Sequence, residues 1–600
     1  LKGQINTTNA AMSFGPVTLG ANTTLNTNAT TNVADITLGA ITGSSYNLTL
    51  NTGANIAGAD VSGTSFNGTG SLNLQNIGGT ASFTGGISAS DLSVANTVNN
   101  VSLTGNGGTI TNAVAFNNVG ALTLGSSGNS QSYSGGITAT VPTSITITVG
   151  GTIQSININL AVSGAGNTVI PTLIDLGSGS LSKSGSGTLT LSGANTYTGG
   201  TTITAGTLTL GASDVLANTG AVTVNGGTLA LGGYSDTVGA VTIGTAGGSI
   251  TSTTGVLTGS SYTFNNTSSA TVSAILAGSV NLTQAGSGTT TLSGANTYTG
   301  TTTISAGTLV ISADNQLGAV PGSATPGSIV FNGGTLNTAA TFTLNANRGI
   351  AMTGNGTINV DGSTTLTYNG IIAGSGDLTK SGAGTLVLGG ANTYTGTTSI
   401  SAGSLNINGD LIDSANIVVN SGATYIVNSA DVINTVTGSG SVVLGSNLTV
   451  GHGNIAFEFD GVFSGTSSLI KTGSASMTLS GNNTYSGNTV LNSSSLILNN
   501  ASALGAGALI SNAGSLSLGD GQILNSLRIS GPITISTAIH TSGSQVYDGP
   551  VTITAAAGQT ANLKNYANAV VAEQGVNLIS TNGSITFSGT INGGTAKNQS

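Results

Sequence analysis

The stretch Leu181–Gly211, LSKSGSGTLTLSGANTYTGGTTITAGTLTLG, decides how this 600-residue chain folds. Three near copies of it follow: LTQAGSGTTTLSGANTYTGTTTISAGTLVIS at 282–312, LTKSGAGTLVLGGANTYTGTTSISAGSLNIN at 378–408 and LIKTGSASMTLSGNNTYSGNTVLNSSSLILN at 469–499. Self-similarity of this kind along a chain indicates a repeat architecture, in which one structural unit stacks on the next.

Each copy contains two short segments in which apolar residues alternate with Thr, Ser or Asn. In the first copy these segments end at Leu191 and Leu210, nineteen positions apart, and the other three copies have the same spacing. Period-2 alternation interrupted by Gly and Asn predicts short strands joined by turns. This interval is too short for a βαβ unit, which needs about 30 residues. We therefore predict an all-β chain, a parallel β-solenoid with about 19–22 residues per coil, in which each coil stacks on the last.

The rest of the chain shows the same alternation of apolar and polar residues, in weaker copies of the repeat. The segment SFTGGISASDLSV at 82–94, for example, echoes TYTGGTTIT at 196–204. We predict three segments of one solenoid: degenerate coils over 1–175, coils with the four repeats over 176–510, and a continuation over 511–600.

Charged residues are scarce, and their scarcity excludes several classes of protein. Only 4% of the residues are charged, with 8 Lys and Arg against 17 Asp and Glu, a net charge of −9 and no Cys. Nucleic-acid binding depends on basic groups that displace counterions, so we expect no nucleic-acid partner. Apolar runs long enough to span a membrane need about 18 residues or more, and none occurs. In-register stacking would also place like charges about 4.8 Å apart, which explains why the chain avoids them.

Three positions recur in the four copies and need an interpretation. One position holds Lys183, Lys380 and Lys471, but Gln284 in the second copy. Because Gln replaces Lys there, we interpret this position as a solvated edge residue. The other two positions form the Asn-Thr-Tyr core, which we predict to be a corner with the tyrosine packed across it and not a ligand site: Asn195, Asn296, Asn392, Asn483, Tyr197, Tyr298, Tyr394 and Tyr485.

The densest group of ionisable residues is AFEFDG, with Glu458 and Asp460 and with His452 nearby. Paired carboxylates on one strand face are what glycan-cleaving chemistry requires, so these two acids are the one weak site candidate. Phe457 and Phe459 alternate with them, which favours an outward polar face over an aromatic core. We predict no catalytic, cofactor-binding or metal-binding residues elsewhere and no cofactor.

Two further groups of ionisable residues are interpreted as structural. Asp410 and Asp413 flank a short turn and are taken as turn residues. The two histidines, His452 and His540, are far apart in the sequence and have no Cys partners, so a zinc site is not expected.

The stretch GTLTLSGANTYTGGTTITAGTLTLG resembles the passenger-associated repeat of autotransporter adhesins, which belong to type V secretion. The segment 545–591 is similar to filamentous-haemagglutinin-like exoproteins of two-partner secretion. Both resemblances imply a right-handed parallel β-helix rod on the outside of Gram-negative bacteria, and neither transfers a catalytic residue. The chain begins without a signal segment and ends without strands typical of a translocator barrel, so we expect an internal fragment or a processed form.

These observations predict a non-enzymatic adhesin or scaffold rod, secreted or at the cell surface. It would be attached to the outer membrane through a region outside this sequence. Its expected partners are glycans or proteins of host or bacterial surfaces, bound by multivalent polar contacts, or other copies of itself, with no membrane insertion. Two alternatives stay open: a self-assembling extracellular filament or sheath subunit, and a polysaccharide-active β-helix enzyme.

Overall fold

A computed structural model describes residues 1–53, 56–125, 131–135, 178–492, 495–499 and 502–512. Within 136–177 and beyond 512 it describes mainly strands. The side chains of segment 545–591, for which a second resemblance was predicted, and of His540 lie outside the described residues. No described helix is both long and apolar enough to cross a membrane.

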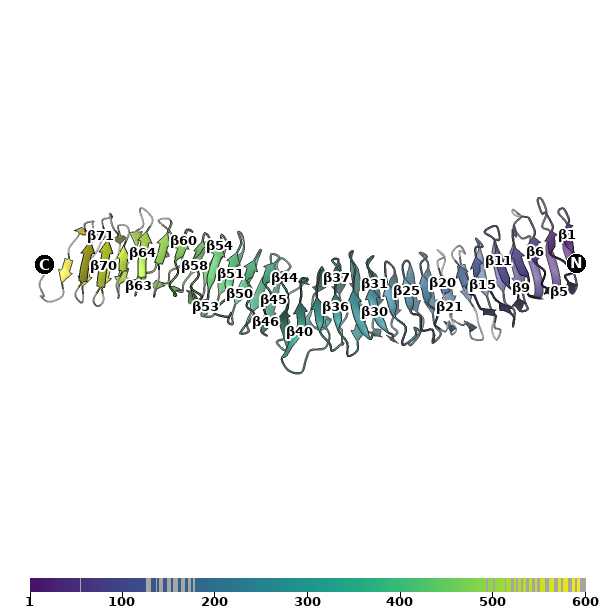
Figure 1. The fold of residues 1–600 in the computed structure, drawn as a ribbon, viewed down its shortest axis with the longest axis horizontal. Coiled ribbons are helices and arrows are strands. Elements are labelled where there is room, and N and C mark those ends of the chain that lie inside the picture. The colour runs from purple at the N-terminus through teal and green to yellow at the C-terminus, as the bar shows by residue number, and fades with distance from the viewer. Residues whose placement is uncertain are drawn as a thin grey trace. The chain divides into compact units, whose positions relative to one another are not determined.

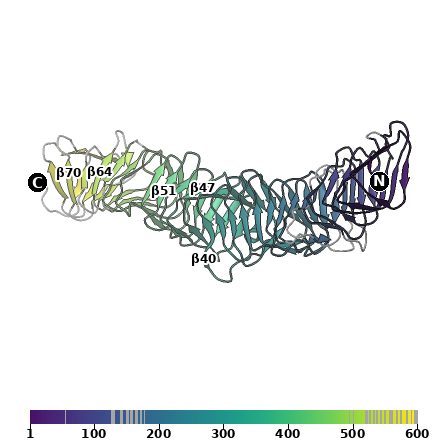
Figure 2. The same cartoon turned by 45° about the vertical axis from the view of Figure 1, so that its right-hand side comes forward.

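The chain forms two compact units, and each is a parallel β-solenoid. The first contains Leu1–Gly300 with Asn315–Ala319, and the second contains Thr301–Asp314 with Val320–Ser600. Figure 1 shows the strands of each unit stacked one behind another along the chain, and the turned view in Figure 2 shows the loops that join them around each coil. Among the described residues the one helical element is a 3₁₀ turn, η1 (Asp314–Leu317). The predicted all-β solenoid is confirmed.

Two long sheets build the first unit. One begins with β1 (Gly3–Asn6) and reaches β36 (Leu282–Gln284), and the other begins with β2 (Met12–Phe14) and reaches β37 (Thr289–Leu292). Neighbouring strands in both sheets are parallel, as in the pair of β1 with β4 (Thr23–Asn26). A strand inside either sheet therefore takes its backbone partners from the coil before and the coil after, which satisfies N–H and C=O groups without helices.

The second unit has the same parallel construction with its strands in three main sheets. One of them runs from β39 (Thr308–Ile311) to β73 (Val576–Ser580). A seven-stranded sheet runs from β42 (Phe342–Leu344) to β58 (Val462–Gly465), and a nine-stranded sheet from β53 (Asp431–Ile433) to β75 (Ile591–Gly593). A fourth group of strands, β38 (Thr302–Ile304), β40 (Thr325–Phe331), β43 (Arg348–Met352) and β46 (Ile372–Gly374), belongs to the first coils of this unit.

Each repeat supplies two successive coils with two strands per coil. The register places Leu191 opposite Leu210, Leu388 opposite Ile407 and Leu479 opposite Leu498. This is the predicted coil spacing. The strands are β23 (Leu181–Lys183), β24 (Thr188–Leu191), β25 (Thr201–Ile203) and β26 (Thr207–Leu210) in the first repeat, β47 (Leu378–Ser381), β48 (Thr385–Leu388), β49 (Thr398–Ile400) and β50 (Ser404–Ile407) in the third, and β59 (Leu469–Lys471), β60 (Met477–Leu479), β61 (Thr489–Leu491) and β62 (Ser495–Leu498) in the fourth.

Coil length varies more than the repeats alone predict. Among the shortest steps, Thr424 pairs with Ser441, only seventeen positions later. The longest step pairs Thr302 with Ile329, twenty-seven positions later, and includes the loop before β40. The base of that loop is anchored by Arg348, whose Nε lies 2.9 Å from Oδ1 of Asp314. Loops between strands absorb these insertions because the strand register is kept on either side of them.

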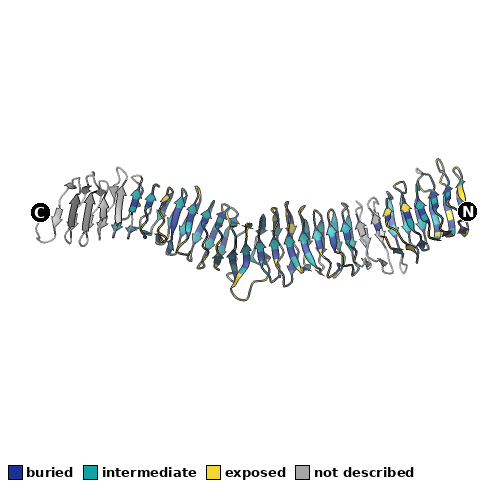
Figure 3. Cartoon of the chain, in the orientation of Figure 1, coloured by how far each residue is buried: buried dark blue, intermediate teal, exposed yellow. Residues whose placement is uncertain are grey.

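The core is a set of apolar ladders inside each coil. Many strands of four residues read intermediate–buried–intermediate–buried, as in β24, where Leu189 and Leu191 are inside and the threonines are outside. Figure 3 shows this alternation along the strands of both units. Outward Thr suits a pleated surface because its β-branched side chain packs well there. The tight turn of the third repeat requires glycine, because Gly403 has a φ of 64° and a Cβ there would lie 2.4 Å from the carbonyl oxygen of Gly384.

Candidate functional site

The Asn-Thr-Tyr segment of each repeat lies between strands and turns its Asn and Tyr side chains inward. The asparagines join three coils to one another. In the second repeat, Oδ1 of Asn296 accepts from the backbone N–H of Leu276 (2.8 Å), and its amide donates to the carbonyl of Gln316 (2.6 Å). One partner lies on the preceding coil and the other on the following coil. All four asparagines are buried: Asn195, Asn296, Asn392 and Asn483.

The third and fourth repeats use the same arrangement. Oδ1 of Asn392 accepts from the N–H of Ile372 (3.0 Å), and its amide donates to the carbonyls of Gly390 (3.0 Å) and Asp410 (3.3 Å). In the fourth repeat the partners of Asn483 are the N–H of Phe463 and the carbonyl of Ala503. In the first, the amide of Asn195 donates to the carbonyl of Val215 (2.7 Å). Unpaired buried amides are costly, so this residue fixes the spacing of coils at the corner.

The tyrosine two residues later fills the corner. The hydroxyl of Tyr394 lies 2.6 Å from Oγ1 of Thr398, and Tyr197 makes the same contact with Thr201. Burial raises the pKa of Tyr394 to about 12, so its hydroxyl stays protonated and available as a donor. All four tyrosines are buried: Tyr197, Tyr298, Tyr394 and Tyr485.

The predicted position of the repeat lysines at a solvated edge is wrong. Lys183, Lys380 and Lys471 are 0% exposed, and so is Gln284 in the second copy. In the sheet register Lys380 lies between Ile358 of the preceding coil and Ile400 of the following one. The long apolar stem of lysine stacks in this ladder, as is common for amphipathic side chains.

The lysine ammonium groups bind backbone carbonyls at a corner of the coil. Nζ of Lys380 donates to the carbonyls of Ser381 (2.8 Å), Gly382 (2.8 Å) and Ala402 (3.2 Å). Lys183 likewise donates to Gly185 of its own coil and to Ala205 of the next coil. Burial lowers the pKa of Lys380 to about 8. The position therefore requires an N–H donor to the turn more than it requires a charge.

Gln284 shows that a neutral donor suffices at this position. Its Nε2 donates to the carbonyl of Gly286 (2.9 Å), two residues on, as Lys183 and Lys380 donate to Gly185 and Gly382. Its Oε1 has no hydrogen-bond partner in the described part of the chain.

Two buried aspartates continue the asparagine positions in the coils that follow. Oδ2 of Asp236 accepts from the N–H groups of Val215 (3.0 Å) and Leu216 (2.9 Å), both on the preceding coil. Its Oδ1 is buried without a hydrogen-bond partner in the described residues. Burial raises the pKa of Asp236 to about 6, and the nearby Asp214 charge contributes in the same direction.

The second of these aspartates, Asp431, is paired with another carboxyl group. It accepts from the N–H of Leu411 (3.3 Å) and the hydroxyl of Tyr425 (3.2 Å), and the carboxyl group of Asp410 is its neighbour. Burial and this neighbour both raise the pKa of Asp431. Asp410 and Asp413 are both exposed. Asp410, which the sequence indicated to be a simple turn residue, is also the carboxyl neighbour of the buried Asp431.

The weak site candidate lies on an outward face. Glu458 is the exposed middle residue of β57 (Phe457–Phe459), Asp460 follows directly and is exposed too, and both phenylalanines are buried. Oε1 of Glu458 accepts from the hydroxyl of Ser480 (2.7 Å) and the amide of Asn499 (3.1 Å) on successive coils. The carboxylate is thus engaged in a polar ladder along the surface. His452 is also exposed.

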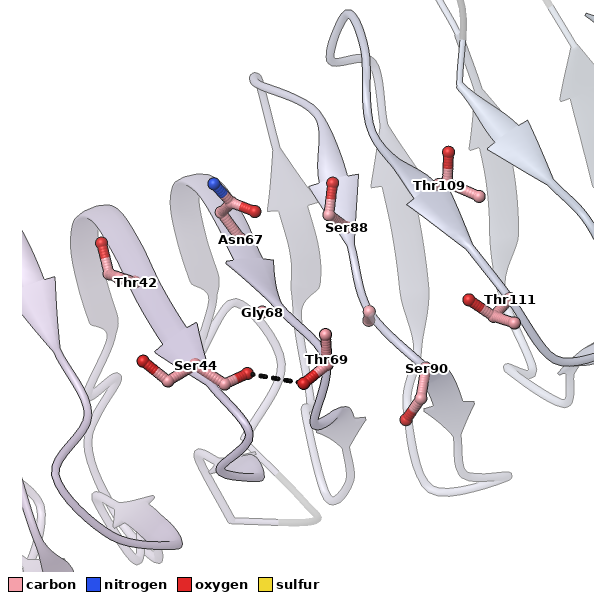
Figure 4. A pocket seen from close by; sticks show the side chains of 10 residues that line it. Thr42, Ser44, Asn67, Gly68, Thr69, Ser88, Ser90, Thr109 and Thr111 are labelled. Atoms are coloured by element: carbon pink, nitrogen blue, oxygen red, sulfur yellow. Dashed lines mark hydrogen bonds between the residues drawn. The ribbon is translucent and has the colours of Figure 1, made fainter.

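A groove in the first unit was not predicted. It has a volume of about 450 Å³ and spans four successive coils. The coils are represented by β5 (Ile36–Ser44), β7 (Val61–Gly68), β10 (Ile87–Ser88) and β13 (Thr109–Ile110). Figure 4 shows two rows of polar side chains along it, Thr42, Asn67, Ser88 and Thr109 in one row and Ser44, Thr69, Ser90 and Thr111 in the other.

The floor of the groove is backbone. Each coil contributes an outward–middle–outward triplet, T-G-S, N-G-T, S-A-S or T-I-T, with Gly43, Gly68, Ala89 and Ile110 in the middle. A Cβ on Gly43 would lie 2.7 Å from the ring of Phe66, and one on Gly68 would lie 2.8 Å from the carbonyl of Ser44. Side chains cannot fill the space between the rows, because the middle residues point inward or lack a side chain.

The groove lies where the coils become shorter. Thr42 pairs with Asn67, twenty-five positions later, and Asn67 pairs with Ser88, twenty-one positions later. The register between β5 and β7 also shifts after Thr42, so that Ser44 lies opposite Gly68. The four triplets are visible in the sequence, but only the pairing of the coils shows that they lie side by side.

Comparison with known protein families finds the same four repeats that the strand register shows. The family model of the passenger-associated transport repeat matches residues 181–210, 282–311, 378–407 and 469–498. No group of three or more His, Cys, Asp or Glu side chains that could hold a metal ion occurs in the described part of the chain.

A curated protein is similar over a longer stretch. The adhesin BmaC autotransporter of Brucella suis biovar 1 (strain 1330) is 29% identical over 292 residues, which cover 43% of this chain and 8% of that protein. No solved structure matches the chain significantly. The four repeats and this similarity support an autotransporter passenger domain that contains passenger-associated repeats.

Proposed function

We infer that this chain is the passenger of a cell-surface adhesin and acts without catalysis, by holding polar binding surfaces outside the outer membrane. The observation that carries the proposal is the division of polar groups between the two faces of the coils. Charged and amide side chains such as Lys380 and Asn392 face inward and tie coils together. Hydroxyls and amides on outward positions, including both rows of the groove, remain for contacts with a partner.

The similarity to an adhesin supports the same proposal, although the chain covers 8% of that relative's length. Outward hydroxyls give weak individual contacts, and their repetition along the coils compensates through multivalency. Autotransporter passengers are secreted to the cell surface, where such contacts meet other cells.

The test is display of the chain on a non-adherent bacterial host through a translocator domain. We expect attachment to epithelial cells or to glycan-coated surfaces to exceed that of the same host displaying an unrelated solenoid. Equal attachment by both hosts, at equal surface density, would refute the adhesin function.

Two further readouts address the alternatives. Electron microscopy of the secreted chain should show separate particles, and long uniform fibres would favour a filament subunit instead. Incubation with a glycan panel should release no products. Product release that is lost in Glu458→Gln or Asp460→Asn would favour the enzyme alternative.

A further inference from the structure

We propose that the groove over β5, β7, β10 and β13 is the binding site for a short uncharged oligosaccharide. This inference rests on the adhesin function and adds to it a location and a ligand class. Its volume of about 450 Å³ falls within the range of about 300–1,000 Å³ that is usual for small-ligand sites. Every residue that lines it belongs to the first unit.

The lining has the chemistry of a polyol-binding surface. Eight of the ten lining residues carry a hydroxyl or an amide, and the other two are Gly68 and Ala89. A hydroxyl group offers one donor and two acceptor positions, and an amide offers both kinds as well. A ligand rich in hydroxyls can therefore be matched along the whole groove, whereas an apolar peptide would find no exposed aliphatic or aromatic side chain in the lining.

Most of these polar side chains make no hydrogen bond with the described protein: Thr42, Ser44, Asn67, Ser88, Thr109 and Thr111. They exchange water for ligand without breaking internal contacts. The other two have their donors fixed, because Oγ1 of Thr69 donates to the carbonyl of Ser44 (3.3 Å) and Oγ of Ser90 donates to Oδ2 of Asp91 (2.7 Å). Their remaining lone pairs face a ligand as acceptors, which suits sugar hydroxyl donors.

The charge around the groove disfavours ionic ligands. No lining residue is charged, and the carboxylate of Asp91 lies behind Ser90 of the second row. Hydrogen bonds from Asn112 and Ser90 lower the pKa of Asp91, so it stays ionised and repels sulfated or sialylated glycans. Its oxygens already accept from Asn112 (2.8 Å), Ser90 (2.7 Å) and Ser71 (3.2 Å), which leaves it poorly placed to hold a cation.

The repeat of the rows fits a chain-like ligand. Parallel strands of successive coils lie about 4.8 Å apart, close to the length of one sugar ring, so successive coils can meet successive sugars. The absence of an aromatic platform among the lining residues predicts weak binding at a single groove, which display of many copies on a cell would strengthen.

The experiment uses the whole chain on an array of neutral gluco-, galacto- and N-acetylhexosamine oligosaccharides, printed beside sialylated and sulfated forms of the same cores. We expect binding to at least one neutral core and weaker binding to its anionic forms. The double variant Asn67→Ala/Ser88→Ala should lose at least tenfold in affinity. The control, Thr223→Ala/Thr242→Ala, removes an equally stacked outward pair from β27 (Val222–Val224) and β30 (Ala240–Ile243) and should change nothing.

Binding to no neutral core, preference for anionic forms, or equal loss in both double variants would each overturn the proposal. The adhesin function is tested separately by displayed cells. If the Asn67→Ala/Ser88→Ala cells attach like wild type, the groove proposal fails and the adhesin function stands. If wild-type cells do not attach, the adhesin function itself fails.

Discussion

The coils of the third repeat and the coils of the groove contain the same kinds of polar residue and use them in opposite directions. In the third repeat, Asn392, Thr398 and Lys380 face inward and bind backbone or side-chain groups of their own and neighbouring coils. In the groove, Thr42 and Asn67 face outward, and their side chains bind nothing within the described protein. The direction, and not the residue type, decides whether a polar side chain stabilises the solenoid or is free for a partner.

The largest loss of stability is expected when the asparagine at the corner of a repeat is replaced. Asn392→Leu should destabilise the coils around it by about 2–4 kcal/mol, because the N–H of Ile372 and the carbonyl of Asp410 lose a buried partner. Amide hydrogen exchange of the full chain measures this as faster opening of β46, β49 and β51 (Asn416–Val419). The matched outward change, Asn67→Leu, should stay within about 0.5 kcal/mol. Similar effects of the two changes would refute the distinction.

A smaller loss is expected at the buried lysine. Lys380→Met keeps the apolar stem but leaves three carbonyls without their donor, which should cost about 1–3 kcal/mol. Lys380→Gln should recover much of this, because Gln284 supplies the same donor in the second repeat. Local hydrogen exchange of β47 and β49 compares the two variants. If Met is tolerated better than Gln, the donor role of this position is wrong.

The buried Asp236 makes the first unit sensitive to pH. Its pKa in the folded chain is about 6, above the ordinary 3.8, so between these values the folded state holds a proton that the unfolded chain has released. The stabilisation of the folded state by the proton on Asp236 is complete below about pH 4. It falls as the pH rises to about 6 and is lost above that. Each unit of pKa difference corresponds to about 1.4 kcal/mol.

We therefore expect this region to be more stable at pH 4.5 than at pH 7. Urea unfolding of the full chain at both pH values, followed by amide hydrogen exchange of β27 and β28 (Thr228–Gly232), tests this direction. Asp236→Asn should reduce the pH dependence of this region. An unchanged pH profile in the variant would show that another group titrates.

The smallest of these effects concerns the tyrosine hydroxyl. Tyr394→Phe removes one hydrogen bond, to Thr398, and leaves the packed ring in place, so about 1 kcal/mol is expected. The same exchange experiment detects it at β49. A loss as large as that of Asn392→Leu would mean that the hydroxyl, and not the asparagine, holds the corner.

Much of the fold could be predicted because its determinants are local in sequence. Period-2 alternation and the constant spacing between positions such as Leu191 and Leu210 sufficed for the strands, the coil and the stacking. The short step from Thr424 to Ser441 and the long step from Thr302 to Ile329 were missed, because loops can change length without any change in the strand pattern.

The prediction for the repeat lysines was wrong because it followed the polarity of lysine and not its place in the inward–outward alternation of the strand. Lys183 lies two residues after the buried Leu181, which is the inward phase of the strand. The groove and the Asp410–Asp431 pair were missed for a different reason. Both bring together residues that lie one coil apart, and which ones meet depends on the length of each coil.

The nearly constant step between paired residues within the repeats has a consequence for how the chain reaches its structure. Strands within the repeats pair with the strand one coil away, as Leu189 does with Leu208 and Lys380 with Ile400. The sequence separation of contacting residues therefore does not grow with the number of coils, and the entropy of closing each new loop is the same small increment. Each finished coil offers an open edge that templates the next one, so added length extends the molecule without slowing the elementary step of its folding.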